Sequence, residues 1–216
     1  MVLTTGVVRS VNVGRARTFE YRGKTATSAI WKYPASGRVQ VQGVNIEGDE
    51  QADRTVHGGT DKAVYSYAAE DYEWWAGQLG RPPDFGEFGE NLTTGGLDLS
   101  SALVGEHWEV GTTVLEVSEP RVPCWKFGVR MNDPTFPRQF MKASRPGTYL
   151  RIVSEGEIGE GDAIRVISRP SHDLTVGDVF RIYASDRHEA GRFLEVSQIP
   201  DSWRTWAERW LARSAE

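Results

Sequence analysis

Short apolar runs separated by polar and turn-forming residues occupy the first two thirds of the chain. The runs are rich in Val, Ile, Tyr and Trp and are bounded by Gly, Pro or charged residues, which is typical of β-strands. They predict strands over Gly6–Val13, Thr27–Trp31, Arg38–Val44, Ala63–Tyr67, His107–Val110, Thr113–Val117, Tyr149–Val153 and Ala163–Ile167. Short strands in this number favour a barrel or a closed sandwich, and therefore a mainly β fold.

A few helices interrupt the strand pattern. Ala69–Leu79 carries large apolar residues at helical spacing, and the Gly80 and Pro82 that follow it end helices. A weaker pattern predicts a second helix near Thr135–Lys142. Glu109–Thr112 has the glycine of a tight turn, so we expect a hairpin between the two strands that flank it.

The pattern becomes helical after Pro170. Three short helices are expected at Thr175–Tyr183, Arg187–Val196 and Asp201–Arg213, with Asp186 as the N-cap of the second. Three tryptophans recur at helical spacing in the last one: Trp203, Trp206 and Trp210. Such a stripe packs a small bundle far more often than it lines a ligand site. We therefore expect a strand-rich domain over residues 1–170 and a small all-α three-helix unit over residues 171–216, apart from any cofactor site.

Composition indicates an ordinary globular protein, with 39% hydrophobic and 25% charged residues. No apolar run approaches the roughly 20 residues that cross a bilayer, and the first residues lack the apolar stretch of a secretory signal. We expect a cytoplasmic protein without membrane contact.

Charge is unevenly spread along the chain. The net charge is −5, but residues 121–151 hold seven basic side chains and one acid, a local charge of +6. A concentrated basic stretch in an acidic protein is typical of a site for an anionic ligand, and equally of a solvated basic loop. It argues against duplex DNA, for which a broadly basic domain is expected.

The single cysteine, Cys124, lies in the segment Pro120–Lys126. One cysteine excludes an internal disulfide and the multi-cysteine zinc and iron–sulfur patterns. Two prolines stiffen the segment, and Arg121 and Lys126 flank the thiol. Nearby cations favour the thiolate, which is the form that binds metal or attacks. A lone thiol is more often a buried small hydrophobe, and the flanking cations bring the two interpretations to even weight.

A glycine-hinged loop, His57–Val64, runs into a predicted strand. Its glycines let backbone amides approach a ligand closely. It also brings the side chains of His57, Asp61 and Lys62 together within six residues. Loops of this kind cradle anions, but many are only turns.

Two further segments carry polar side chains beside apolar ones. In Phe88–Leu92, Asn91 can both donate to and accept from a pterin or purine edge, and Glu90 could orient a cation or a ring N–H. A plain glycine turn explains this segment equally well. In Gly147–Arg151, strand alternation places two side chains on one face, Tyr149 and Arg151.

Taken in order, these segments resemble the motif set of MOSC domains, and more narrowly that of the YiiM-type, hydroxylaminopurine-resistance branch. The segments are His57–Val64, Phe88–Leu92, Pro120–Lys126 and Gly147–Arg151. The tail after Pro170 is similar to the three-helix domain that follows the MOSC domain in that branch. The resemblance covers nearly the whole chain, and it implies a MOSC-type barrel-like core.

The resemblance also implies a cofactor and an activity. MOSC relatives carry the molybdenum cofactor (molybdopterin), with the motif cysteine as metal ligand, a role that falls on Cys124. The remaining motif residues would hold the cofactor: His57, Asp61, Lys62, Asn91, Arg121, Lys126, Tyr149 and Arg151. YiiM-like proteins are associated with reduction of N-hydroxylated compounds to amines. His57 or Glu90 would then deliver protons to the departing oxygen.

The chemistry of the residues agrees with that implication. A thiolate is a soft ligand suited to a redox metal, and Arg and Lys side chains suit the cofactor's phosphate. The sequence carries no flavin, haem or iron–sulfur signature, so we expect a separate electron-donor protein.

Three alternatives remain open at this point. Cys124 could carry a persulfide in a sulfur-transfer protein without redox turnover, or the chain could store or deliver the cofactor. The basic stretch and the aromatic residues could also bind single-stranded nucleic acid. The acidic remainder of the chain argues against this last alternative, and no stable nucleic-acid binding is expected.

Overall fold

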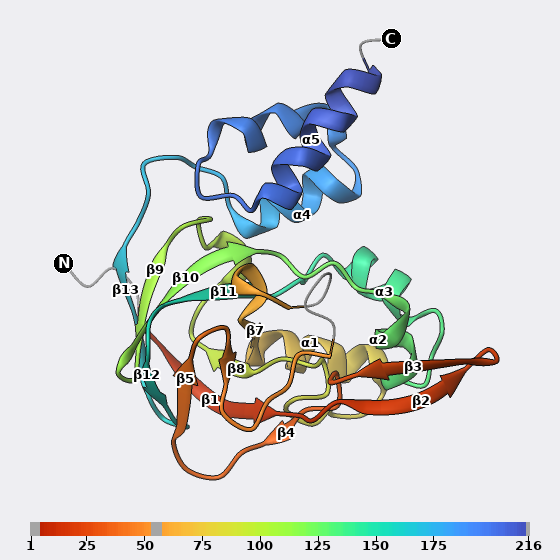
Figure 1. The fold of residues 1–216 in the computed structure, drawn as a ribbon, viewed down its shortest axis with the longest axis vertical. Helices are drawn as coiled ribbons and strands as arrows, with labels where there is room; N and C mark the ends of the chain where they lie inside the picture. The colour runs from red at the N-terminus through yellow and green to blue at the C-terminus, as the bar shows by residue number, and fades with distance from the viewer. Residues whose placement is uncertain (1–4, 53–57, 215–216) are drawn as a thin grey trace.

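The computed structural model describes residues 5–52 and 58–214. Seven strands close into a barrel, in the order β13-β9-β10-β11-β7-β8-β1 and back to β13 (Figure 1). All neighbours are antiparallel except β7 and β8, which run parallel. The barrel strands are β1 (Thr5–Val13), β7 (Val64–Ala68), β8 (Leu92–Gly95), β9 (His107–Val110), β10 (Thr113–Glu119), β11 (Thr148–Ser154) and β13 (Ala163–Ser168).

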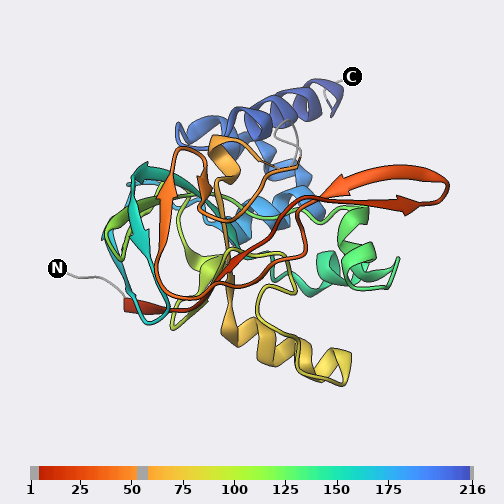
Figure 2. The same cartoon turned by 60° about the horizontal axis from the view of Figure 1, so that its bottom comes forward.

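Shorter strands extend the barrel at its rim. β4 (Tyr33–Pro34) pairs with the end of β1, and β5 (Val39–Gln42) pairs with both β6 (Asn45–Ile46) and β12 (Gly156–Ile158). The hairpin of β2 (Arg17–Tyr21) and β3 (Lys24–Ser28) projects away from the barrel (Figures 1 and 2).

Helices cover two opposite sides of the barrel. Figure 2 shows α1 (Ala69–Leu79) on one side and the C-terminal helices on the other. The C-terminal helices are α4 (Val176–Ala184), the 3₁₀ helix η3 (Arg187–Glu195) and α5 (Asp201–Ser214). The remaining helices are α2 (Trp125–Arg130), α3 (Phe136–Ala143) and two 3₁₀ turns, η1 (Thr60–Lys62) and η2 (Leu99–Ser101). Within the described residues, no helix has both the length and the apolarity needed to span a membrane.

Three apolar cores hold this arrangement together. Inward-facing strand residues such as Val64, Leu115 and Leu150 fill the barrel and are fully buried. An aromatic cluster that includes Trp75 and Phe127 lies between the barrel, α1, α2 and α3. The third core joins the C-terminal helices to the loop before β9 through buried apolar side chains, so those helices pack directly on the barrel. Burial of this kind contributes roughly 25 cal/mol for each Å² of apolar surface.

The predicted mainly β, barrel-like fold with several C-terminal helices is confirmed. The helix predicted over Ala69–Leu79 and the turn within Glu109–Thr112 are also present. The strand predicted over Thr27–Trp31 is wrong in position, because the chain turns at Arg22 and Gly23, both at positive φ, and the second strand runs over Lys24–Ser28.

Two elements differ from what the sequence pattern predicts, and so does the cap of one of them. β8 escaped prediction because Leu92–Gly95 contains two threonines and a glycine, although all four residues are buried. The second C-terminal helix is a 3₁₀ helix. Asp186 does not cap that helix with its side chain, since its carboxylate is bound by Arg181 at 2.5 Å.

Candidate functional site

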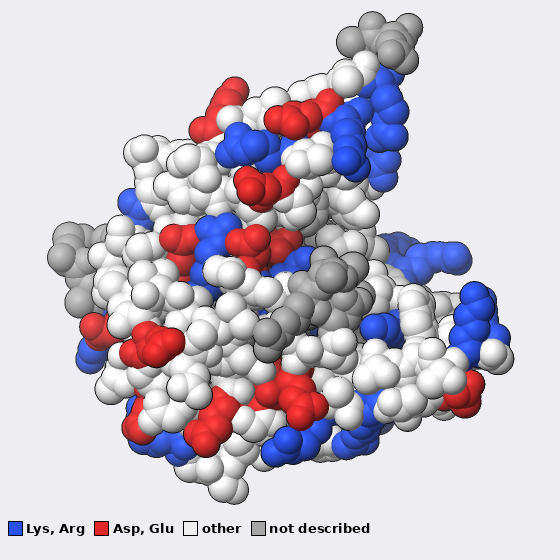
Figure 3. All heavy atoms as spheres, in the orientation of Figure 1, with Lys and Arg blue, Asp and Glu red and all other residues white. Residues whose placement is uncertain are grey.

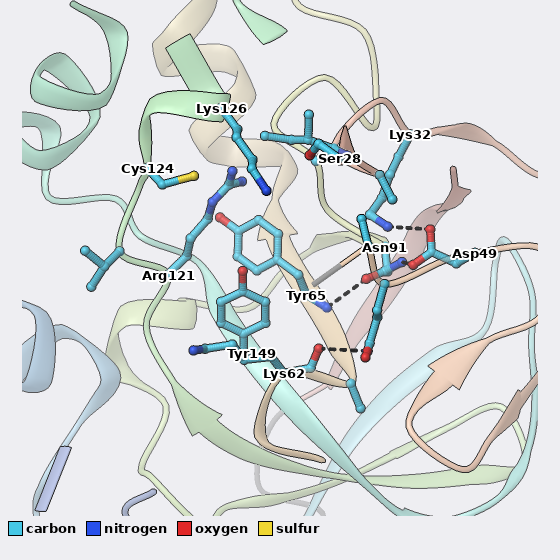
Figure 4. Close-up of a pocket in the computed structure, with 17 residues that line it drawn as sticks. Ser28, Lys32, Asp49, Lys62, Tyr65, Asn91, Arg121, Cys124, Lys126 and Tyr149 are labelled. Carbon is cyan, nitrogen blue, oxygen red and sulfur yellow. Dashed lines mark hydrogen bonds and ion pairs between the residues drawn. The ribbon is translucent and has the colours of Figure 1, made fainter. Parts of the chain in front are cut away.

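Cys124 lies in the loop between β10 and α2, half-buried at the wall of a cavity. Figure 4 shows its sulfur pointing toward the side chains of Arg121 and Lys126. Pro120 and Pro123 both precede the thiol and restrict the backbone that leads from β10 to it. The fold therefore presents the single thiol to a cationic cavity.

The cavity has a volume of about 100 Å³ and is lined mainly by polar and cationic side chains. Among the described residues, four cationic side chains and one carboxylate line it: Lys32, Lys62, Arg121, Lys126 and Asp49. Pockets that enclose a drug-sized ligand measure roughly 300–1,000 Å³. The cavity therefore suits an anionic group of a larger ligand.

Arg121 is a buried and fixed cation at this cavity. Its guanidinium donates a hydrogen bond to the backbone carbonyl of Phe88 and lies 4.1 Å from the ring centre of Phe127. A cation above an aromatic ring is held by the ring's electron density. The positive charge is thus placed before any ligand arrives.

Lys32 and Asp49 form a buried ion pair that the sequence patterns did not reveal. Asn91 donates to the other carboxylate oxygen of Asp49 at 3.0 Å and accepts from the backbone N–H of Tyr65 at 3.1 Å. Burial lowers the pKa of the Lys32 ammonium, and Asp49 opposes that shift. A signal did exist, since Lys32 interrupts the apolar run Ala29–Tyr33.

Two tyrosines form another wall of the cavity. The rings of Tyr65 and Tyr149 lie 4.9 Å apart, and the Tyr65 hydroxyl donates to the carbonyl of Pro146 at 2.8 Å. Burial raises the pKa of Tyr149 to about 12, against the effect of Arg121. Burial also raises the pKa of Tyr65, so both phenols are neutral at physiological pH; the hydroxyl of Tyr149 can donate to a ligand, whereas that of Tyr65 already donates to Pro146.

Six of the residues predicted to form the site line this cavity: Lys62, Asn91, Arg121, Cys124, Lys126 and Tyr149. His57 lies outside the described residues. The predicted residues that are described and not among those lining the cavity are Asp61, Glu90 and Arg151.

Arg151 and Asp61 pair with each other instead. The Nε of Arg151 donates to Asp61 at 2.6 Å, and its guanidinium also binds Glu116. A further N–H of Arg151 reaches the carbonyl of Gln198, 3.0 Å away in the C-terminal segment. Alternation along β11 is as predicted, with Leu150 buried in the barrel. Arg151 thus connects β11 to the segment before α5.

Glu90 is fully buried and is not among the residues that line the cavity. One carboxyl oxygen accepts from the hydroxyls of Tyr72 and Thr93 and from the backbone N–H of Gly86. Its Oε2 has no hydrogen-bond partner among the described residues. Burial raises the pKa of this carboxyl, which explains how it is tolerated there.

The local charge of residues 121–151 does not form a single patch around the cavity. Only Arg121 and Lys126 of its seven basic side chains line the cavity. Arg145 binds Asp71 at 2.5 Å. Figure 3 shows basic and acidic side chains interspersed over the face it displays. The cationic character of the cavity comes equally from Lys32 and Lys62, which reach it from other segments.

A second cavity, of about 330 Å³, adjoins the first. Four residues line both: Lys62, Val122, Cys124 and Tyr149. The C-terminal helices supply Tyr183, Ser202, Trp203 and Trp206 to the second cavity. Among the described residues, none after Pro170 lines the first cavity, and the expectation that the helical unit takes no part in the cofactor site stays a prediction. Its aromatic side chains do share the second cavity with Cys124.

Comparison with known proteins places the chain in a family. The MOSC domain model matches residues 53–165. YflK of Bacillus subtilis is 35% identical over 91% of this chain and 90% of its own length, and YiiM of Escherichia coli is 31% identical over 88% and 87%. A protein of Gibberella moniliformis named "Reductase" is 33% identical over 90% of this chain, which spans 35% of that longer protein.

A solved structure shows the same fold over almost the whole chain. YiiM from Geobacillus stearothermophilus superposes with a TM-score of 0.79 at 27% identity, covering 95% of this chain and 99% of that one. The barrel and the C-terminal helices thus occur together in a solved relative. The chain belongs to the MOSC-domain family, as a YiiM-like member.

Proposed function

We propose that this protein is a molybdenum-cofactor-dependent reductase that converts N-hydroxylated compounds to amines. The observation that carries the proposal is the position of the single thiol, Cys124, at the wall of a cavity with four cationic side chains. The relative named as a reductase, 33% identical, supports the coarser assignment to redox chemistry.

The residues of the cavity fit the anionic part of this cofactor. A thiolate is a soft ligand suited to molybdenum, and Cys124 would supply it. Arg121 and Lys126 would bind phosphate or other anionic oxygens, and Lys62 also lines the cavity. The cavity volume of about 100 Å³ suits such a group, and the remainder of the cofactor would extend beyond it. When bound, the cofactor would supply two-electron redox chemistry.

The chain's own residues would bind the anionic part of the cofactor and orient it in the cavity. Arg121 is already held by Phe88 and Phe127, so anion binding would require little reorganisation of this side chain. The ion pair of Lys32 and Asp49 would hold Asn91 with its amide fixed at the cavity wall. Tyr65 and Tyr149 would exclude water and offer neutral hydroxyls.

The overall reaction would take two electrons and two protons: R–NH–OH + 2e⁻ + 2H⁺ → R–NH₂ + H₂O. The N–O bond breaks, and the oxygen leaves as water. The electrons would come from a separate donor protein. His57, which lies outside the described residues, keeps its predicted role as a proton source, whereas the deep burial of Glu90 argues for a structural role.

Turnover by protein loaded with the molybdenum cofactor tests this proposal. With an artificial low-potential donor, wild type should reduce an N-hydroxylated base or an amidoxime, and Cys124→Ser should lose at least about a hundredfold in rate, the order of loss for removing a metal's ligand or its support. Equal rates in the two proteins would contradict the proposal. Labile sulfur on Cys124 without bound metal would favour the sulfur-carrier alternative.

A further inference from the structure

The hairpin of β2 and β3 begins at the cationic cavity and lies outside the three apolar cores. β3 ends at Ser28, which lines that cavity (Figure 4). Within the described residues the two strands pair only with each other, and they project away from the barrel (Figures 1 and 2). A two-stranded hairpin alone is at best marginally stable in water. Its conformation therefore depends on side chains that contact it from the rest of the chain.

Six side chains contact one another in a row along the hairpin, with an arginine at each end. We call this row the ladder, and its members are, in order, Arg17, Trp31, Phe19, Trp125, Tyr21 and Arg22. The centres of neighbouring rings lie 5.2, 6.0 and 4.8 Å apart along the row. Each terminal guanidinium lies within 6 Å of the ring next to it, at 5.9 and 5.3 Å. Such ring–ring and cation–ring contacts hold the hairpin against the segments that carry Trp31 and Trp125.

The ladder reaches the thiol through Trp125, the residue that follows Cys124. The side chain of Trp125 stays 43% exposed, although it contacts both Phe19 and Tyr21. Tryptophan, tyrosine and arginine are the residues that contribute most to the affinity of protein–protein interfaces. A half-exposed row of these residues beside the proposed metal ligand therefore has the composition of a docking surface.

The face that carries the ladder is basic. Strand pairing places Arg17 and Lys24 on the same face as the ladder's rings, and Arg22 lies in the turn. The hairpin's acid, Glu20, lies on the other face and accepts a hydrogen bond from the hydroxyl of Thr25 at 2.6 Å. No carboxylate of a described residue forms an ion pair with these three cations. Such a surface attracts an acidic partner and repels the same surface of a second copy.

The proposed reduction consumes two electrons that come from another protein. Electron transfer is fast only over short distances, so the donor has to contact the surface next to Cys124. The relative from Gibberella moniliformis that is named as a reductase matches this chain over 35% of its own length, so about two thirds of that protein lies outside the match. That additional length has room for a donor domain joined to the same kind of chain.

We propose that the ladder and the three cations around it are the docking surface for an acidic electron-transfer protein that carries a flavin or an iron–sulfur cluster. The inference rests on the proposed function and deepens it by naming the class of its redox partner. The donor is oxidised by two electrons, which the N-hydroxylated substrate takes up with two protons, and no bond forms between the proteins. Burial of Trp125 in the interface brings the donor against the loop that carries Cys124.

Binding of flavodoxin and of ferredoxin, two small acidic electron-transfer proteins, to the full chain tests this surface. At low ionic strength, surface plasmon resonance should detect binding of at least one of them to wild type, and added salt should weaken it. Arg22→Asp combined with Lys24→Glu reverses two exposed charges away from the cavity and should weaken this binding at least about tenfold. Aspartate tolerates the positive φ of position 22.

A matched variant controls for the change in net charge. Arg209 and Arg213 are exposed on α5, which lies apart from the hairpin in Figure 1. Arg209→Glu combined with Arg213→Glu reverses the same number of charges and should bind the same donor within twofold of wild type. In protein loaded with the molybdenum cofactor, the hairpin variant should keep the wild-type rate with a small artificial donor, which needs no docking. It should be slowed about tenfold with the reduced donor protein.

The outcomes separate this inference from the proposed function. Equal weakening in the two double variants would overturn the docking surface, and so would failure of both donor proteins to bind wild type. A wild-type rate of the hairpin variant with the donor protein would overturn it as well. Stronger binding of a single-stranded oligonucleotide at the hairpin, or self-association that the hairpin variant loses, would assign the surface to another partner. Loaded wild type that is inactive with the artificial donor would instead contradict the proposed reductase.

Discussion

Arg121 and Lys126 flank Cys124 in the sequence, yet the fold holds them differently. Arg121 is buried against aromatic rings and a backbone carbonyl, so its side chain contributes to the stability of the fold as well as to the charge of the cavity. Lys126 is half-buried in the first turn of α2, and its side chain lines the cavity. Removing Lys126 therefore isolates the effect of charge on ligand binding better than removing Arg121.

Lys126→Ala should weaken the affinity of the protein for inorganic phosphate about fivefold, because a charge-assisted hydrogen bond contributes on the order of 1 kcal/mol. Lys142 belongs to the same basic stretch but is exposed on α3. Lys142→Ala should leave phosphate affinity unchanged in the same titration. If both variants lose the same phosphate affinity, the anion is attracted by the net charge of the basic stretch and does not bind specifically at the cavity.

Glu90 should make the protein less stable as pH rises. Burial raises the pKa of its carboxyl above the ordinary value of 4.5 in the folded state, so the folded protein holds this proton more tightly than the unfolded chain does. The stabilisation is complete below about pH 4.5 and is lost as pH rises toward the folded-state pKa.

Glu90→Gln cannot ionise and should remove this dependence. Urea denaturation should give similar free energies of unfolding for wild type and variant near pH 4, and a growing advantage of the variant toward pH 8. Curves for the two proteins that stay parallel across this range would contradict the assigned pKa shift.

At the scale of elements, a hydrogen bond between two buried side chains joins α5 to the end of β10. The indole N–H of Trp203 donates to the buried carboxyl of Glu119 at the end of β10. Burial raises the pKa of Glu119, while Lys62 and Trp203 oppose that shift. The contact therefore fixes both the docking of α5 and the carboxyl at the second cavity.

Trp203→Phe keeps an aromatic ring but removes the donor, and it should lower the free energy of unfolding by roughly 1–3 kcal/mol because a buried acceptor loses its partner. Trp210 also lies on α5, and its indole N–H has no hydrogen bond to a described residue. Trp210→Phe should therefore cost clearly less in the same urea titration. If Trp203→Phe lowers the free energy of unfolding by no more than Trp210→Phe does, apolar packing alone holds α5 against the barrel.

The sequence predicted the elements better than it predicted the site. Strand alternation correctly put Leu150 in the barrel, but it could not say that Arg151 would meet Asp61 and Glu116. Segment Pro120–Lys126 was found because its residues are neighbours along the chain. Lys32 and Tyr65 were not, since they approach Cys124 from other segments and only the closed barrel brings them together.

At the scale of the whole molecule, Cys124 lies where the barrel and the C-terminal helices meet. Val104 and Val122, both from the barrel side, pack with the apolar core of the C-terminal helices, and Arg151 binds the carbonyl of Gln198. Removing residues 171–216 would therefore expose apolar surface of the barrel next to the thiol. The two parts of the chain form one functional unit in this account.

The molybdenum content of the protein shows whether Cys124 is the metal ligand. Wild type and Cys124→Ser, produced in the same cells able to make molybdenum cofactor, would be purified identically and compared by elemental analysis and circular dichroism. We expect close to one molybdenum per wild-type chain and essentially none in Cys124→Ser, with matching circular dichroism spectra. Stoichiometric molybdenum in a folded Cys124→Ser protein, or none in wild type, would contradict it.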